Sequence, residues 1–398
     1  MSIAATDTDT SSVRSPAWSA VFALTLCVGT LIASEFLPVS LLTPIASGLQ
    51  ISEGRAGQAI AVSGLFAVLT SLLISPLTQG IDRRKVLLTL TLVMLVSGFM
   101  VAFAPNAAVF MTGRALIGVV IGGFWSMSAA NVMRLVPKHD VARALGLLNG
   151  GNALATTIAA PLGSFLGQYI GWRGAFFCVV PLAVLTLAWQ FVSLPPLPSP
   201  VSAPARGGGV FRVLRRQQVP VGMLAVAVFF MGQFALFTYL RPFLEAVTRV
   251  DVSQLSMLLL ILGGAGLLGT YLIGFLLRTR LFSLLVAMPL AMAAIALALI
   301  AYGQSAIAVS VLLAGWGLIA TAAPVGWWTW LSKVLPDDAE AGGGLMVAVI
   351  QLAITAGASI GGVVFDRSGY AATFALSAAI LCGSALLALM AWRARAHA

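Results

Sequence analysis

Two charged residues stand inside long apolar stretches, and together their side chains could bind and release a proton. Glu35 lies in LCVGTLIASEFLPVSLLTP, and Arg114 lies in the apolar run from Phe110 to Arg134. Apolar surroundings disfavour the charged form of a carboxyl group, whereas a nearby guanidinium favours it. We therefore expect Glu35 to carry a proton reversibly and Arg114 to set its affinity. Two alternatives remain, namely a structural ion pair between two helices and an arginine that snorkels to the end of its helix.

The composition shows which kind of element must position these residues. Of 398 residues, 60% are hydrophobic and 9% are charged, and the mean hydropathy is +1.02. Soluble proteins carry about 25% charged residues, and about 20 consecutive apolar residues suffice to cross a bilayer. The sequence therefore predicts an all-α polytopic membrane protein. The net charge of +10 then indicates basic loops facing anionic lipid rather than a nucleic-acid partner.

Apolar runs separated by short polar, proline or glycine breaks predict twelve transmembrane helices in two six-helix bundles. The predicted spans lie near 18–43, 57–79, 86–104, 109–133, 142–168, 174–194, 219–242, 254–277, 281–302, 305–332, 342–365 and 371–393. The longest break, rich in Pro, Ser and Gly, has the composition of a flexible linker. The predicted division is an N-terminal tail 1–17, a first bundle 18–194, a linker 195–218, a second bundle 219–393 and a C-terminal tail 394–398.

The distribution of basic residues predicts the orientation. Counted loop by loop, 16 Lys and Arg residues fall on one face and 5 on the other, and Arg114 completes the total of 22. Cytoplasmic loops carry the excess of basic residues. We expect both termini and the linker to lie in the cytoplasm.

The two halves resemble each other, which favours a duplicated six-helix unit. Residues 160–176, APLGSFLGQYIGWRGAF, align without a gap on residues 358–374, ASIGGVVFDRSGYAATF, at a constant offset of 198. Chance similarity between helices rich in Gly and Ala is the alternative. In duplicated transporters of this kind, the substrate site lies between the two halves.

Eleven of the twelve acidic residues fall in tails, loops or helix ends, and Glu35 is the exception. It precedes Thr43 by eight residues, so we expect it about 12 Å from the outer end of its helix, and we expect Arg114 about 8 Å from the same face. These depths allow a contact or a shared aqueous cavity. Amide and aromatic residues within the spans are weaker candidates for a site that binds a flat, neutral solute. These tentative substrate residues are Trp125, Asn152, Gln233, Phe237, Tyr239, Trp316 and Gln351.

Several activities lack the residues that they need. The nucleotide-binding pattern G-x-x-x-x-G-K-[ST] is absent, and both histidines lie in segments predicted to be cytoplasmic. We expect no ATP hydrolysis, no enzymatic activity, no cofactor and no metal site. No ring of charges indicates a channel.

The loop between the second and third predicted spans resembles a signature of the major facilitator superfamily, in its drug:proton antiporter branch. We call it the loop signature; it consists of Asp82, Arg83, Arg84 and Lys85. Thr78 stands where that pattern usually has a glycine. The resemblance implies a cytoplasmic latch on the outward-open state, and plain anchoring by positive charge is the alternative.

Two further motifs carry the same resemblance. Arg114, Gly118 and Gly122 resemble the fourth-helix motif that the branch associates with proton coupling. The fifth-helix antiporter motif is matched by Gly151, Ala160, Pro161 and Gly163, with Ala160 in place of the usual glycine. The resemblance implies the major facilitator fold and export by proton antiport with alternating access.

Stretches in both halves are similar to those of bacterial purine ribonucleoside exporters within this branch. They include EFLPVSLLTP at 35–44, GGFWSMSA at 122–129, FTYLRP at 237–242, PVGWWTW at 324–330 and VAVIQLA at 347–353. The resemblance implies a bacterial inner membrane as the location and inosine, guanosine or adenosine as substrate, with a sugar or drug exporter as the alternative. The expected partners are this substrate, a proton and the lipid bilayer, with no nucleic acid, and we expect a monomer.

Overall fold

The computed structural model describes residues 17–198, 214, 219–335 and 339–396, and all regular structure in these ranges is helical. The long helices of the first half are α1 Trp18–Ser40, α3 Glu53–Leu77, α4 Arg83–Ala102, α5 Ala107–Leu135, α6 Val141–Phe177 and α7 Val179–Ser193. Those of the second half are α9 Val219–Phe237, α11 Val252–Tyr302, α12 Ala306–Val334 and α13 Ala339–Ala396. Short helical pieces join them, namely α2 Leu42–Leu49, η1 Lys138–Asp140, α10 Leu240–Phe243 and η2 Leu244–Thr248.

The described helices account for twelve crossings of a bilayer. Ten helical segments are long and apolar enough to cross a bilayer, with α6 and α7 joined as one segment and α11 divided into two. Two of these ten, Arg143–Ser193 and Gly342–Arg393, each contain two crossings because the backbone turns at Gly171 and Gly369. The prediction of a twelve-span helical membrane protein is therefore confirmed.

The internal repeat of the sequence is also seen in the backbone conformation of the same two glycines. Gly171 has φ 70° and Gly369 has φ 73°, and both ψ angles are extended. A positive φ is costly for residues with a Cβ, so each half uses glycine to reverse the chain between its fifth and sixth spans. The two positions lie at the offset of 198 residues found in the sequence.

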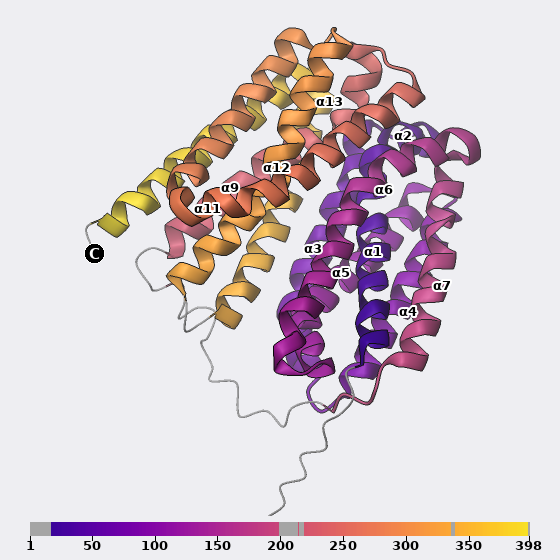
Figure 1. Cartoon of the computed structure of the whole chain (residues 1–398). Helices are drawn as coiled ribbons and strands as arrows, with labels where there is room; N and C mark the ends of the chain where they lie inside the picture. The colour runs from indigo at the N-terminus through magenta and orange to yellow at the C-terminus, as the bar shows by residue number, and fades with distance from the viewer. Residues whose placement is uncertain (1–16, 199–213, 215–218, 336–338, 397–398) are drawn as a thin grey trace, which may run out of the picture.

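The helices form two groups that touch at one end and diverge at the other (Figure 1). We call α1–α7 the first group and α9–α13 the second group. The end at which α7 stops and α9 starts is the linker end, and the opposite end is the closed end. The predicted linker and the predicted N-terminal tail fall largely outside the described residues, whereas residues 394–396 of the predicted C-terminal tail continue α13. The domain boundaries stay predictions.

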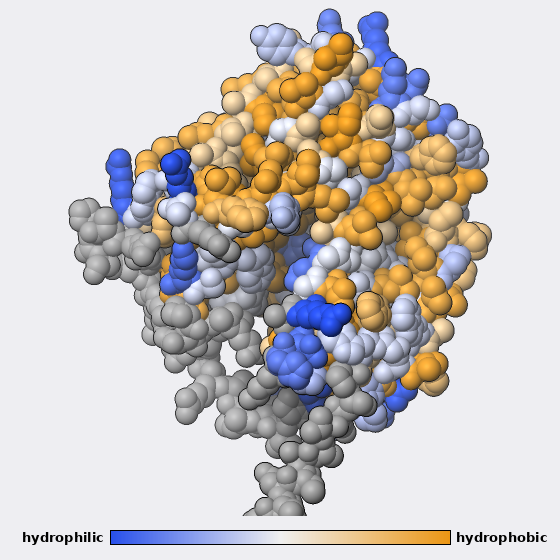
Figure 2. All heavy atoms as spheres, in the orientation of Figure 1, coloured by the Kyte–Doolittle hydropathy of each residue, from blue (hydrophilic) through white to orange (hydrophobic). Residues whose placement is uncertain are grey.

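The groups meet along α3 and α13 and along α6 and α11. On α3 the contacts run from Gly54, which meets Asp366, to Gly64, which meets Thr355. Ten residues of helix correspond to about 15 Å, and the rest of α3 continues to the linker end beyond this strip. Figure 2 shows the surface hollowed between the groups, with paler, less hydrophobic residues at the hollow than on the outer flanks. We call this hollow the recess.

The first span ends at Ser40, three residues before its predicted end, and α2 follows after Leu41. Pro38 lies in the last turn of α1. Proline lacks the N–H that would bond to the carbonyl four residues earlier, and its ring crowds that carbonyl. The helix continues through the proline for only two more residues.

Candidate functional site

Arg114 lies on α5, seven residues after the helix begins, and 1% of its surface is exposed. Its guanidinium donates four hydrogen bonds to oxygen atoms of α1 and α3. The acceptors are the carbonyls of Ser34 (2.7 Å), Glu35 (3.2 Å) and Ala59 (3.3 Å) and the hydroxyl of Ser63 (3.2 Å). Arg114 therefore joins three helices of the first group, and none of these four acceptors is the Glu35 carboxylate.

The shortest of these bonds satisfies the carbonyl that Pro38 leaves without a hydrogen-bond donor within α1. The carbonyl of Ser34 is the one that residue 38 would satisfy in a regular helix, and proline cannot do so. Arg114 donates Nη1–H to this carbonyl at 2.7 Å. A buried carbonyl without a partner is costly, so Pro38 gives a physical reason for the position of the arginine.

The Glu35 side chain points towards the second group. Its carboxyl group interacts with the side chain of Gln351 on α13 and lies within electrostatic range of Arg114. Glu35 is half-buried, and Gln351 is buried. The predicted proximity of Glu35 and Arg114 is found, but a backbone carbonyl of Glu35 makes the direct contact. The carboxylate is the part that spans the two groups.

Helix geometry places this contact at the deep end of the recess. Glu35 precedes the end of α1 by five residues, about 8 Å from the closed end. This is less than the predicted 12 Å because α1 stops at Ser40. Gln351 lies one helical turn before Thr355, whose hydroxyl donates to the Ala61 carbonyl of α3 at 3.3 Å. Glu35 and Gln351 thus follow directly after the strip at which the groups are closed.

Aromatic residues extend the contact between the groups beside Glu35. Phe36 of α1 has its ring centroid 6.4 Å from that of Phe234 and 6.4 Å from that of Phe237. Phe237 was a predicted substrate residue, whereas Phe36 and Phe234 were not singled out. The adjacency of Phe36 to the acid was the signal available in the sequence. Base–aromatic stacking contributes about 1–3 kcal/mol per base in nucleic-acid complexes, so such rings suit a flat ligand.

Three other tentative substrate residues lie on helices that border the same region. Gln233 of α9 is buried, and its Oε1 has no hydrogen-bond partner among the described residues. Trp125 of α5 and Asn152 of α6 are half-buried. The described contacts of these three residues do not include Glu35 or Gln351.

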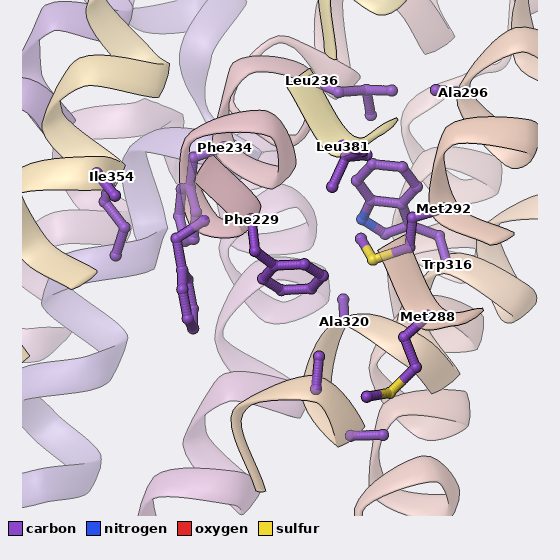
Figure 3. Packing of buried hydrophobic residues seen from close by; sticks show 14 of the residues in the cluster. Phe229, Phe234, Leu236, Met288, Met292, Ala296, Trp316, Ala320, Ile354 and Leu381 are labelled. Atoms are coloured by element: carbon purple, nitrogen blue, oxygen red, sulfur yellow. The ribbon is translucent and has the colours of Figure 1, made fainter. Parts of the chain in front are cut away.

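Tyr239 and Trp316 lie elsewhere. Tyr239 follows α9 at the closed end, is fully buried and donates its hydroxyl to the Ala358 carbonyl at 2.8 Å. Trp316 is fully buried in the interior of the second group near Met292 and Leu381 (Figure 3). Both positions are those of packing residues, and we leave these two residues out of the site proposed below.

The loop signature lies at the linker end and contacts the first group. Asp82 caps α4 by accepting from the Arg84 N–H at 2.8 Å, and it also accepts from the Leu197 N–H at 3.0 Å. Arg84 donates to the Phe191 carbonyl at 2.7 Å, and Arg83 donates to the Thr78 hydroxyl at 2.5 Å. In this state the signature therefore binds the end of α7 and the residues that follow it.

The two helix motifs pack helices together. Gly118 of α5 lies so close to α3 that an added Cβ would stand 2.2 Å from the Ser63 carbonyl oxygen. On α6, Gly151 and Gly163 lie against α1, while Ala160 and Pro161 are buried. These contacts set the relative positions of the helices that carry Arg114 and Glu35.

Comparison with known proteins identifies the family. The model of the Major Facilitator Superfamily matches residues 23–346, which is most of the chain. The chain belongs to the Major Facilitator Superfamily. It is a multi-pass membrane transporter and not an enzyme.

Two curated superfamily relatives match over nearly their full lengths. The transcription regulatory protein OpdE of Pseudomonas aeruginosa is 57% identical over 97% of this chain and 96% of its own length. The purine ribonucleoside efflux pump NepI of Salmonella paratyphi B is 43% identical over 94% of each chain. One is thus named as a regulatory protein and the other as a pump.

Solved structures show the same fold. The nucleoside transporter NupG aligns with a TM-score of 0.76 over 94% of this chain and 99% of its own, at 12% identity. The D-xylose-proton symporter aligns with a TM-score of 0.75 over 95% and 98% of the two chains, at 18% identity. At these identities the comparison concerns the major facilitator fold alone.

Proposed function

We propose that this transporter exports purine ribonucleosides such as inosine, guanosine and adenosine in exchange for protons, with Glu35 as the proton carrier. The observation that carries the proposal is the position of the Glu35 carboxyl group. It lies at the deep end of the recess, interacts with the Gln351 side chain of the opposite group and has Arg114 fixed behind it. A single acid in this place can either bind a proton or, in its ionised form, interact with side chains of the other group.

The substrate class is supported by the chemistry of the site and by one relative. Gln351, Phe237 and the unpartnered Oε1 of Gln233 offer hydrogen bonds and an aromatic surface to a neutral, planar base. The relative NepI is named as a purine ribonucleoside pump. A sugar or drug exporter remains the second candidate, since these exporters share the same framework.

In the proposed cycle the linker end faces the cytoplasm, because 16 of the 22 basic residues belong to segments that the sequence predicts on that face. The state described here is then open to the cytoplasm and ready to receive substrate. Opening of the other end releases the substrate and lets a proton reach Glu35. In that state the loop signature serves as the latch at the linker end. One charge crossing 100 mV releases about 2.3 kcal/mol, which supports a gradient of about fifty-fold in a neutral solute.

The test uses purified protein in vesicles with an imposed pH gradient. Wild type is expected to accumulate radiolabelled inosine against its gradient, and accumulation should stop when a protonophore collapses the pH difference. Glu35→Gln should still exchange inosine for inosine but should not accumulate it. Asp251→Asn is the matched control, because Asp251 caps α11 at the exposed closed end and asparagine caps equally well.

Two outcomes contradict parts of the proposal. Undiminished accumulation by Glu35→Gln eliminates the carrier role of this residue. Transport of a sugar or a drug by wild type without any flux of inosine, guanosine or adenosine eliminates the substrate class. If the protein moves none of these solutes and deletion of its gene alters gene expression, a regulatory role like the one in the name of OpdE is favoured instead.

A further inference from the structure

A buried arginine of the second group holds the end of a helix of the first group. Arg241 of α10 is 4% exposed, and its Nη1–H donates to the carbonyl oxygen of Ser40, the last residue of α1. Its Nε–H donates to Glu245 at 2.8 Å. The last carbonyls of a helix lack partners within the helix and carry partial negative charge, which favours a cation at this position.

An acid of the second group holds the start of another helix of the first group. Asp366 of α13 accepts from the Gly54 N–H at 2.9 Å and from the Ser52 hydroxyl at 2.6 Å. Ser52 is the residue that caps α3. The first N–H groups of a helix carry partial positive charge, so an anion is favoured there. The bond from Ser52 is solvent-exposed and the bond from Gly54 is partly buried, and we therefore expect this contact to be weaker than the buried contact of Arg241.

Small residues on α3 make room for this closure. A Cβ at Gly54 would stand 2.3 Å from a carboxylate oxygen of Asp366, and a Cβ at Gly57 would stand 2.2 Å from the Tyr239 hydroxyl. Tyr239 is fully buried between α3 and α13. The closed end is therefore shaped for direct contact between the two groups.

We propose that Arg241 and Asp366 are the gate of the closed end, holding it shut by capping α1 and α3 of the first group with charges of the sign that each helix end favours. Both contacts join a side chain of one group to backbone atoms of the other, so both must break when this end opens. Arg241 also lies within electrostatic range of Glu53 on α3. Without the arginine, Glu53 and Glu245 would face each other across the interface as like charges.

The test measures the opening of this end directly, without substrate and without a pH gradient. Spin labels at Ser47→Cys in the first group and Ser253→Cys in the second group occupy exposed positions at the closed end. Cys178 and Cys382 are exposed and are first replaced by serine. Pulsed electron resonance then gives the distance distribution between the two labels in purified protein. The result does not depend on which solute is carried, so it can fail or succeed separately from the proposed function.

Arg241→Met is expected to raise the ratio of open to closed populations at this end at least ten-fold, since a hydrogen bond to a charged group contributes about 1.5–3 kcal/mol and each 1.4 kcal/mol is about a factor of ten. Asp366→Ala should raise it about three-fold. Arg173→Met is the matched control, because Arg173 donates to the Ala104 carbonyl at 2.8 Å within the first group. It should leave the distribution unchanged.

The gate role is refuted if Arg241→Met leaves the distance distribution as in wild type, or if Arg173→Met shifts it equally. Should Arg241→Met fail to fold, Arg241→Lys keeps the charge but has one nitrogen in place of the Nε and Nη1 that reach Glu245 and Ser40, and we expect an intermediate shift. An unchanged distribution in both Arg241→Lys and Asp366→Ala also overturns the proposal.

Discussion

The contact between Arg114 and the proline gap in α1 can be measured as a coupling between two substitutions. Arg114→Met removes four hydrogen bonds, of which the bond to the Ser34 carbonyl is the shortest. Pro38→Ala restores an N–H at position 38, and that N–H can bond to the same carbonyl. Loss of the arginine should therefore be less damaging when the proline is also replaced.

The magnitude follows from the single bond that is replaced. Hydrogen bonds to charged groups contribute about 1.5–3 kcal/mol in soluble proteins, whereas double-mutant cycles in a membrane protein average about 0.6 kcal/mol. We expect a coupling free energy of about 1 kcal/mol, roughly a five-fold change in the folding equilibrium. The other three bonds of Arg114 are lost in both backgrounds and cancel.

The assay is equilibrium unfolding in detergent micelles, followed by the fluorescence of the 9 tryptophans. The cycle compares wild type, each single variant and the double variant. A second cycle pairs Arg114→Met with Pro161→Ala, because Pro161 lies within α6 and is not a partner of Arg114. That pair should be additive. Additivity of the Pro38 pair within about 0.3 kcal/mol would falsify the assignment of Arg114 to the proline gap.

Two further predictions concern stability and use the same unfolding assay. Gly118→Ala should destabilise the protein by about 1–3 kcal/mol, because its Cβ would overlap the Ser63 carbonyl oxygen. Gly146→Ala, with open space around it, should be neutral or slightly stabilising. Equal effects of the two substitutions would contradict the close packing of α3 and α5. Asp82→Ala should lower the free energy of unfolding by about 1 kcal/mol through loss of the α4 cap, and Asp82→Asn should retain most of the wild-type stability. An asparagine variant as unstable as the alanine variant would show that the charge of Asp82 matters more than its capping.

The sequence was sufficient for the membrane spans and for the proximity of Glu35 and Arg114. Long apolar runs indicate spans because a bilayer admits little else. The similar depth of a lone acid and a lone arginine follows from their distances, in residues, to the ends of their helices. The end of α1 was placed three residues too late because apolar residues continue past Ser40 into α2. Pro38 was the available signal for that boundary.

The partners of Arg114 and the gate at the closed end could not be read from residue types. Every residue carries a carbonyl, so the sequence does not mark the ones that accept from Arg114. The contact of Gly54 with Asp366 joins residues 312 positions apart, and no periodic pattern reports such a pairing. Tyr239 and Trp316 were singled out for their residue types, which are the same in a packed interior and in a binding site.

The structural role of Arg114 bears directly on the proposed mechanism. Because its guanidinium is held by three carbonyls of α1 and α3, including the one that Pro38 leaves free, it is expected to stay in place throughout a transport cycle. A proton that binds to Glu35 then changes the charge beside a fixed cation, and the interaction with Gln351 is the contact that responds. Protonation would therefore act on the contact between the two groups rather than on the stability of the first group. This separation of roles is what a carrier requires, since a proton that unfolded its own site could not be exchanged repeatedly.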